Sequence, residues 1–179
     1  MMFHMKRKST VADAPPPRAE AGEGTPFRLE AFLPYRLSVT ANRMSRAFAR
    51  AYAERFGLSI PEWRVMAVLG TGGPLTAAAI VERTAMDKVK VSRAVAALEA
   101  KGFVLRRPHP EDRRSALLEL GEPGVAVFEA IVPLARALEA ELTAVLGPED
   151  RAQLAQLLAR LDAHLSGLGD LSLDAGDPG

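Results

Sequence analysis

Apolar residues recur at helical spacing along most of this chain, beginning with a long N-terminal segment. Over residues 28–56 they return every three or four positions, which is the pattern of a helix with one buried face. Gly57 ends this predicted helix, and Pro61 suits the first turn of the next helix, PEWRVMAVLG. Glycine and proline at positions 72–74 then predict a turn.

Two short helices follow in the middle of the chain, each preceded by a capping residue. Thr76 is a predicted N-cap for AAAIVERT, and Asp87 is a predicted N-cap for KVKVSRAVAALEAK. Gly102 ends the second of these helices at its C′ position. The β-rich segments FVLRR and SALLEL then flank a loop at residues 108–114, which predicts a hairpin. The remaining pattern predicts two more helices, over residues 125–146 and 149–165.

This order of elements predicts a mainly α fold with a small β-wing. We expect a winged helix-turn-helix domain flanked by N- and C-terminal dimerisation helices, together spanning residues 28–167, with a DNA-binding core at about 58–121. Residues 1–27 contain three consecutive prolines and little to bury, and predict a disordered tail. Residues 168–179 predict a flexible C-terminal tail. The basic run at residues 6–8 is either a phosphate contact or, more commonly, a solvated end.

Composition excludes several kinds of site. The chain has 179 residues and no cysteine, which excludes disulfides, thiolate metal sites and a cysteine nucleophile. Its three histidines are far apart and match no metal-binding spacing, so we expect neither a metal nor a cofactor. The sequence has neither an apolar run of membrane-spanning length nor the apolar region of a signal peptide. We therefore expect a cytoplasmic protein with no membrane partner.

The formal net charge of +1 conceals an uneven distribution along the chain. Residues 27–83 and 84–114 each carry eight basic and four acidic residues, whereas residues 115–179 carry three basic and eleven acidic residues. Four of the arginines fall within nine positions of the predicted hairpin. Positive charge is therefore concentrated in the middle of the chain, where it favours a polyanionic partner.

The helix that begins after Asp87 is the predicted DNA reader. Its apolar residues form one stripe that must face the core, which leaves a cluster of polar residues at its N-terminal end on the outside. Arginine can bond the O6 and N7 atoms of guanine, serine can bond base edges or backbone, and lysine neutralises phosphates. The predicted contacts here are Thr76, Lys88, Lys90, Ser92 and Arg93. An ordinary solvated helix face is the alternative for the helix taken alone.

The hairpin favours the DNA-binding interpretation. Arginine at the tip of a β-hairpin can enter a minor groove, where narrow A·T-rich stretches concentrate negative potential. Asp112 is expected to bond Arg114, fixing its guanidinium and bracing the turn, while arginines at the base of the wing suit flanking phosphates. A solubilising edge hairpin is the alternative, but such edges ordinarily use lysines. The predicted wing contacts are Arg106, Arg107, Asp112, Arg113 and Arg114.

The segment LTAAAIVERTAMDKVKVSRAVAALEAKGFVLRRPHPEDRRSALLELGEPG resembles the winged-helix core of the MarR family. The helix ending LEAKGFVLRR, the wing PEDRR and the following GEPG carry the resemblance, which extends over about residues 30–167. It implies a homodimeric transcriptional regulator, most often a repressor that a small molecule releases from DNA. It also implies that Arg114 and Asp112 form a minor-groove element, with Ser92 and Arg93 in the major groove. Lys-Val-Lys at positions 88–90 departs from the family and suggests additional phosphate contacts.

The two C-terminal helices carry wide apolar stripes, more than one small winged domain can cover. Packing against a second copy would bury them and would place two readers about one DNA turn apart, as a palindromic or semi-palindromic operator requires. Packing within one chain is the alternative. The stripes are formed by Val125, Phe128, Val132, Ala135, Leu138, Leu142 and Val145, and by Leu154, Leu157, Leu158, Leu161 and Leu165.

An effector site is suggested by arginines on the first predicted helix. They lie on one arc, a tyrosine lies near its start, and a tryptophan opens the next helix, so an aromatic carboxylate would fit. The segment LPYRLSVTANRMSRAFARAYAERFGLSIPEWRV also resembles a subgroup that controls breakdown of phenolic (hydroxycinnamic) acids, some of whose members sense the CoA thioester. A solvated arginine stripe and a core tryptophan are the alternative. The candidate effector residues are Tyr35, Arg36, Arg43, Arg46, Trp63 and Phe128.

The sequence thus predicts a homodimeric DNA-binding regulator with three partners: a duplex operator, a second copy and an effector that is an aromatic acid or its CoA ester. Two other functions stay open, a winged-helix adaptor between proteins and a DNA-binding protein without a ligand. An enzyme is not expected, because the sequence has no histidine cluster, phosphate-binding glycine loop or paired acids in an apolar setting.

Overall fold

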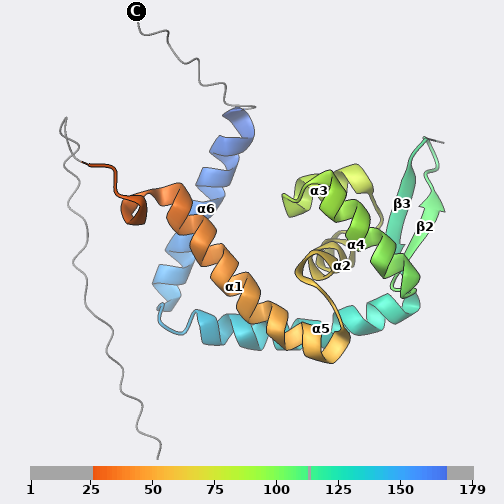
Figure 1. The fold of residues 1–179 in the computed structure, drawn as a ribbon, viewed down its shortest axis with the longest axis horizontal. Coiled ribbons are helices and arrows are strands. Elements are labelled where there is room, and N and C mark those ends of the chain that lie inside the picture. Colours follow the sequence, from red (N-terminus) through yellow and green to blue (C-terminus); the bar gives the residue numbers. More distant parts are fainter. Residues whose placement is uncertain (1–25, 113, 169–179) are drawn as a thin grey trace, which may run out of the picture. The chain divides into compact units, whose positions relative to one another are not determined.

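The computed structural model describes residues 26–112 and 114–168 (Figure 1). These residues fall into two parts, one up to Arg43 and one from Met44, and each is described by itself. The first part contains a short 3₁₀ helix, Leu29–Ala31, and the beginning of α1 (Leu33–Phe56). The predicted tails lie almost entirely outside the described residues.

The second part is mainly helical with one small antiparallel sheet, which confirms the predicted winged-helix fold class. No helix among the described residues is long and apolar enough to cross a membrane. After α1 its elements are α2 (Ile60–Gly72), β1 (Leu75–Thr76), α3 (Ala77–Thr84), α4 (Lys88–Ala100), β2 (Val104–Pro108), β3 (Ala116–Leu120), α5 (Glu122–Leu142) and α6 (Pro148–Leu168).

Local capping explains where the middle helices begin and end. The Thr76 hydroxyl accepts a hydrogen bond from the Ala79 amide at 3.2 Å, and Asp87 Oδ1 accepts one from the Lys90 amide at 2.7 Å. Both predicted N-caps are therefore confirmed. Gly102, with φ of +70°, follows the C-cap of α4 in the left-handed conformation that a side chain would disfavour.

The sheet contains one strand that the sequence pattern did not predict. β3 pairs with β2 along the predicted hairpin, from Val104 opposite Leu120 to Pro108 opposite Ala116. On its other side β3 pairs with β1, a strand of two residues that precedes α3. A strand of two residues is too short to show an alternating pattern in the sequence. Its pairing with β3 attaches the wing to the start of α3.

The core of this part lies between α2, α3, α4 and the sheet, and most of it is aliphatic. The face of α4 predicted to be apolar is buried, with Val91, Ala94, Val95 and Leu98 all less than 5% exposed. They pack in one cluster with residues from the neighbouring elements. Burial of these side chains determines which face of α4 remains outside, because a helix turns by a constant angle per residue.

The predicted stripe on α5 is only partly correct. The residues of α5 that are buried are Gly124 and Ile131, and Ile131 is not part of the predicted stripe. A Cβ atom at Gly124 would overlap the Phe103 carbonyl, so glycine permits this close approach of α5 to the hairpin. Residues of the predicted stripe are half-buried or exposed, and Val125 is 40% exposed.

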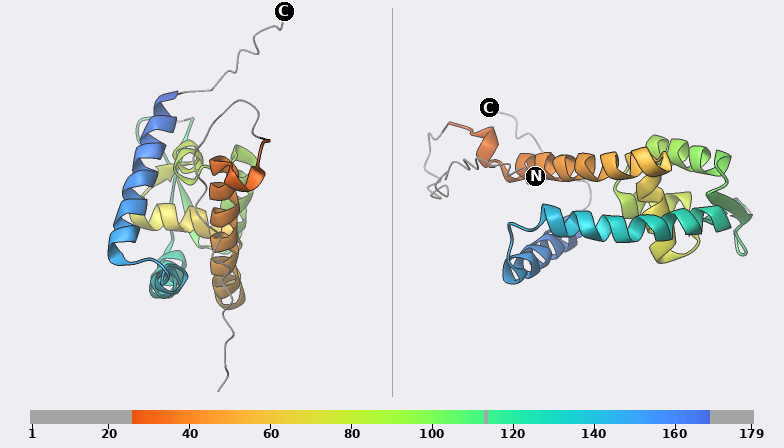
Figure 2. Two further views of the ribbon diagram at one scale, coloured as in Figure 1. Left: turned by 90° about the vertical axis from the view of Figure 1, so that its left-hand side faces the viewer. Right: turned by 90° about the horizontal axis from the view of Figure 1, so that it is seen from below.

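After α5 the chain turns sharply into α6 (Figure 2). None of the α6 residues is buried, and its leucines form a row of apolar side chains that are 39–51% exposed at Leu154, Leu157, Leu158, Leu165 and Leu168. Exposed leucines at helical spacing are costly in water, so this face of α6 is a candidate contact surface.

An ion pair connects the start of α2 to the end of α4. The Glu62 carboxylate is 7% exposed and accepts a hydrogen bond from Lys101 Nζ at 2.6 Å and two from Ser59, from its amide at 2.7 Å and its hydroxyl at 2.6 Å. Lys101 also donates to the Gly57 carbonyl. Burial acts to raise the pKa of Glu62, but the hydrogen bonds from Lys101 and Ser59 outweigh it and place this pKa below its ordinary value.

Lys101→Met should therefore destabilise the fold in a pH-dependent way. At pH 7 the substitution leaves a buried carboxylate without its cation, and we expect a loss of about 2 kcal/mol in the free energy of unfolding, since Lys101 is partly exposed. Because the wild-type pKa of Glu62 is lowered, the stability it confers is present above its unfolded pKa of about 4.3 and is lost as pH falls through the folded pKa. The deficit of the variant should therefore shrink as Glu62 becomes protonated.

Urea unfolding at pH 7 and at pH 3 measures both quantities. Lys90→Met is the matched control, because its partner Asp87 is exposed and such pairs contribute little. An equal loss at the two pH values in Lys101→Met would contradict the assigned role of the ion pair.

Candidate nucleic-acid interface

The outward face of α4 carries the polar residues that the sequence singled out. Lys88, Lys90, Ser92 and Arg93 are all exposed, in the first two turns of the helix. The apolar face on the other side holds them in this orientation. The helix therefore presents three cations and a hydroxyl at its N-terminal end, as expected of a recognition helix.

These cations differ in whether an acid already neutralises them. Lys90 forms an ion pair with Asp87, at 2.9 Å, in addition to the capping bond to its amide. Both hydrogen bonds lower the pKa of Asp87, and the one from the Lys90 amide has the larger effect. Lys88 and Arg93 form no ion pair with another described residue. Most of the charge available to a polyanion on α4 therefore comes from these two.

The wing arginines divide in the same way between base and tip. At the base, Arg106 makes two hydrogen bonds to Glu99, of 2.9 and 3.2 Å, and Arg107 is paired with Glu119. The hydrogen bonds to Glu99 raise the pKa of Arg106. Sequence reasoning assigned both arginines to flanking phosphates without seeing these acid partners, which compete with phosphate for the guanidinium groups.

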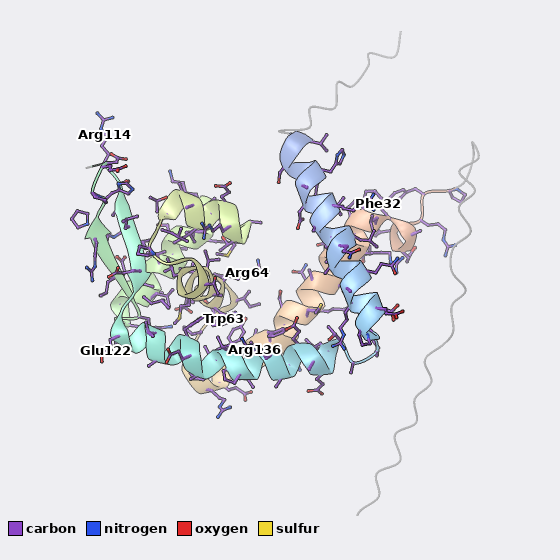
Figure 3. All side chains as sticks on the ribbon, turned by 180° about the vertical axis from the view of Figure 1, so that it is seen from behind. Phe32, Trp63, Arg64, Arg114, Glu122 and Arg136 are labelled. Atoms are coloured by element: carbon purple, nitrogen blue, oxygen red, sulfur yellow. The ribbon has the colours of Figure 1, made fainter. Side chains whose placement is uncertain are left out.

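At the tip, Arg114 lies at the far end of the hairpin and points away from the helices (Figure 3). It is exposed and makes no ion pair with any residue in the described ranges. Asp112 Oδ1 accepts a hydrogen bond from the Arg114 main-chain amide at 2.9 Å. The predicted bracing of the turn is thus present, but it acts on the backbone and not on the guanidinium as predicted. Arg113 lies outside the described residues.

Thr76 has a local role in this structure, because its hydroxyl is the N-cap of α3. It also lines a hollow of about 540 Å³ between the start of α3 and the wing, together with Arg106 and Arg114. Thr76 therefore borders the predicted DNA face, although its hydroxyl already has one partner.

Val89 was missed by sequence reasoning. It lies between Lys88 and Lys90 in the first turn of α4 and is 59% exposed, although it is apolar. The only available signal was its place outside the apolar stripe. An exposed methyl pair at the reading end of the helix is suited to the C5-methyl group of thymine.

A largely apolar cavity of about 390 Å³ lies between α3 and α4, close to the same face. Its walls come mainly from alanine and valine, and two cations lie at its rim. The lining residues are Ala77, Ala78, Val81, Lys88, Val91, Ser92, Val95 and Arg106.

A second region contains an aromatic cluster. Trp63, on α2, is stacked on Phe128 of α5 with 6.1 Å between ring centroids, and lies 5.8 Å from the ring of the buried Tyr52. Arg64, missed by sequence reasoning, donates a hydrogen bond to the Ser45 hydroxyl at 3.3 Å. Burial raises the pKa of Tyr52, and the positive charge of Arg64 acts against this rise.

The structure thus brings together two of the six candidate effector residues, Trp63 and Phe128. Trp63 is half-buried and packs against the core, so the core alternative also describes it correctly. Arg46 is exposed on α1. The other three lie in the first part of the chain, where all are exposed: Tyr35, Arg36 and Arg43.

Comparison with known proteins identifies this arrangement. A sequence profile described as MarR family matches residues 56–115, from the end of α1 to the wing. This segment is therefore similar to the winged helix-turn-helix of the MarR family of transcriptional regulators, in line with the resemblance seen in the sequence.

Relatives and solved structures extend the likeness beyond that segment. The HTH-type transcriptional repressor NicR of Pseudomonas putida is 26% identical over 157 residues, covering 88% of this chain and 95% of NicR. A MarR/EmrR family transcriptional regulator from Acinetobacter sp. ADP1 has a TM-score of 0.72 and 26% identity, covering 79% of this chain and 99% of that one. BpsR of Bordetella bronchiseptica, whose DNA binding is regulated by 6-hydroxynicotinic acid, has a TM-score of 0.69 and 23% identity, covering 77% and 98%.

Arg114→Ala should weaken DNA binding more than Arg107→Ala does. We expect a loss of about 1–3 kcal/mol for Arg114, since nothing described in the chain neutralises it, and a loss below about 0.5 kcal/mol for Arg107, which Glu119 already pairs. Fluorescence anisotropy on a duplex selected from a random library measures both. Equal losses would show that the ion pairs at the base of the wing do not govern the interface.

Proposed function

We propose that this chain is a homodimeric repressor of the MarR family that binds a palindromic or semi-palindromic operator and leaves it when an aromatic acid binds. The observation that carries the proposal is the distribution of unpaired cations. Lys88 and Arg93 on α4 and Arg114 on the wing tip lack an acid partner among the described residues. Lys90, Arg106 and Arg107, in contrast, are paired with acids.

In this proposal α4 enters the major groove with its N-terminal end. Arg93 and Ser92 reach base edges, because both lie on the exposed face one turn into the helix. Lys88, in the first helical position, neutralises a backbone phosphate. Val89 contacts a thymine methyl group and so adds discrimination at an A·T pair.

The wing enters the adjacent minor groove with Arg114. The hairpin is anchored on both edges of β3, by β2 and by β1, so the tip is held at a fixed place relative to α3 and α4. A guanidinium inserted there binds best where the minor groove is narrow and its potential is strongly negative. It therefore favours an A·T-rich sequence beside the bases that α4 contacts.

The dimer is proposed from the α6 leucines. Their row is solvent-exposed on a single chain, and the half-buried stripe of α5 precedes it. Packing against the same helices of a second copy removes this apolar area from water, at about 25 cal/mol per Å². A two-fold dimer then presents two α4 helices to DNA, and a two-fold arrangement of half-sites matches it.

The aromatic effector is proposed from the cluster of Trp63, Phe128 and Tyr52. An aryl ring can stack on such rings, and Arg64 supplies a half-buried cation beside them for a carboxylate. This cluster connects α2, which packs against α4, to α5. A ligand bound between these rings would therefore change how α2 and α5 pack against each other. Regulation of BpsR by an aromatic acid gives a precedent on this fold, and the name of NicR supports repression.

DNA binding should require the dimer and should depend steeply on salt. If two subunits together contact about 6–10 phosphates, affinity should fall about 10³- to 10⁵-fold between 50 and 200 mM salt. Leu157→Glu with Leu161→Glu should give a monomer in sedimentation velocity and abolish this binding. Gln156→Glu, on the opposite side of α6 from the leucine row, is the control. A flat salt response or a monomer that binds as tightly as the wild type contradicts the proposal.

An aromatic acid should weaken operator binding by about 1–3 kcal/mol, the usual size of such coupling. We expect a hydroxybenzoate or hydroxycinnamate to do so, and Arg64→Met to remove the response while the exposed Arg55→Met keeps it. Anisotropy titrations with each free acid and its CoA ester measure the effect. If only the thioester acts and Arg43→Ala or Arg46→Ala removes the response, the α1 arginines hold its phosphates.

Two outcomes would redirect the effector assignment. If Arg64→Met responds normally but Ala78→Leu does not, the ligand occupies the cavity between α3 and α4. If neither class of compound changes DNA affinity, the effector proposal fails and the DNA-binding proposal stands.

A further inference from the structure

His109 occupies a specific place in the wing that its sequence context did not reveal. It follows the last residue of β2 and lies between Pro108 and Pro110, at the start of the loop that leads to Arg114. It is half-buried, whereas its described neighbours in this loop are exposed.

The His109 imidazole accepts hydrogen bonds from the main chain of the tip. Its Nδ1 atom lies 3.2 Å from the Glu111 amide nitrogen and 3.1 Å from the Asp112 amide nitrogen. Both amides donate, so Nδ1 carries no proton and the ring proton is on Nε2. One side chain thus satisfies two consecutive amides that would otherwise need water.

A second side-chain bond continues this chain of contacts toward the arginine. Asp112, whose amide His109 holds, accepts the Arg114 amide through Oδ1, and its carbonyl accepts the Ser115 amide at 3.1 Å. His109 and Asp112 therefore act in series, the first fixing the entry of the turn and the second fixing the backbone at Arg114. His109, Asp112 and Arg114 also line the same hollow beside α3.

We propose that His109 is a positioning residue for Arg114, through the acceptor Nδ1 and not through contact with DNA. The inference rests on the proposed minor-groove role of the wing. A tip that is already ordered loses less conformational entropy when it enters the groove, so affinity is gained without a further contact.

Two substitutions separate the acceptor from the ring. His109→Asn keeps an acceptor oxygen on Cγ, at the same number of bonds from Cα as Nδ1, and loses the ring. His109→Phe keeps an aromatic ring and loses the acceptor. We expect His109→Phe to bind the selected duplex about tenfold more weakly than the wild type, since two hydrogen bonds per wing are lost. His109→Asn should bind within about threefold of the wild type.

The same two substitutions at His109 are then made in an Arg114→Ala background, where there is no guanidinium left to position. There His109→Phe should cost less than about twofold, because its effect is exerted through Arg114. An undiminished tenfold cost in that background would overturn the proposal and indicate that His109 itself contacts DNA. His109→Asn as weak as His109→Phe would also overturn it, because the ring and not the acceptor would then matter.

Amide hydrogen exchange in the absence of DNA provides a readout independent of binding. The Glu111 and Asp112 amides should be protected in the wild type and in His109→Asn, and should exchange faster in His109→Phe, with unchanged thermal unfolding in all three. Identical exchange in the three proteins overturns the positioning role. A wild-type protein that binds no duplex overturns the proposed function, whereas a wild type that binds while His109→Phe binds equally well overturns only this inference.

Discussion

The proposed recognition helix α4 has one apolar face that must leave water, and much of the structure follows from how that face is covered. Val91, Ala94, Val95 and Leu98 pack into the core that α2, α3 and the sheet share. This packing determines the rotation of α4 about its own axis, and therefore which cations face outward. The Glu62–Lys101 ion pair then joins the end of α4 to the start of α2. The buried apolar face and this ion pair thus hold α4 at different points along its length.

Acidic residues determine which cations of this protein are available to a partner, because they form ion pairs with some of the basic residues and not with others. Acids in and beside the basic middle of the chain neutralise particular cations: Asp87 pairs with Lys90, and Glu99 and Glu119 pair with the two arginines at the base of the wing. On α4 and in the described part of the wing, the cations without an acid partner are Lys88 and Arg93 near the helix start and Arg114 at the tip. A net charge near zero is thus compatible with positive charge that is concentrated at particular places on the surface.

The sequence predicted those parts of the fold that depend on neighbours along the chain. Helix starts at Thr76 and Asp87 and the buried stripe of α4 were correct, because capping and helical periodicity are local. The two-residue β1, the burial of Ile131 and the partners of Arg106 and Arg107 could not be predicted, because each depends on a residue distant in sequence. Asp112 differs from these cases, because its predicted partner Arg114 is two residues away, but the bond goes to the Arg114 amide and not to its guanidinium.

Hydroxyl-radical footprinting on the selected duplex tests the central claim most directly, since it records where each element of the proposed dimer lies on DNA. Wild-type protein should protect two equivalent regions about one helical turn apart, each with a minor-groove protection beside it. Arg114→Ala should remove the minor-groove protections and leave the spacing of the other two unchanged. A single protected region, or minor-groove protections that persist in Arg114→Ala, would contradict the account of a two-fold reader whose wing tip inserts arginine.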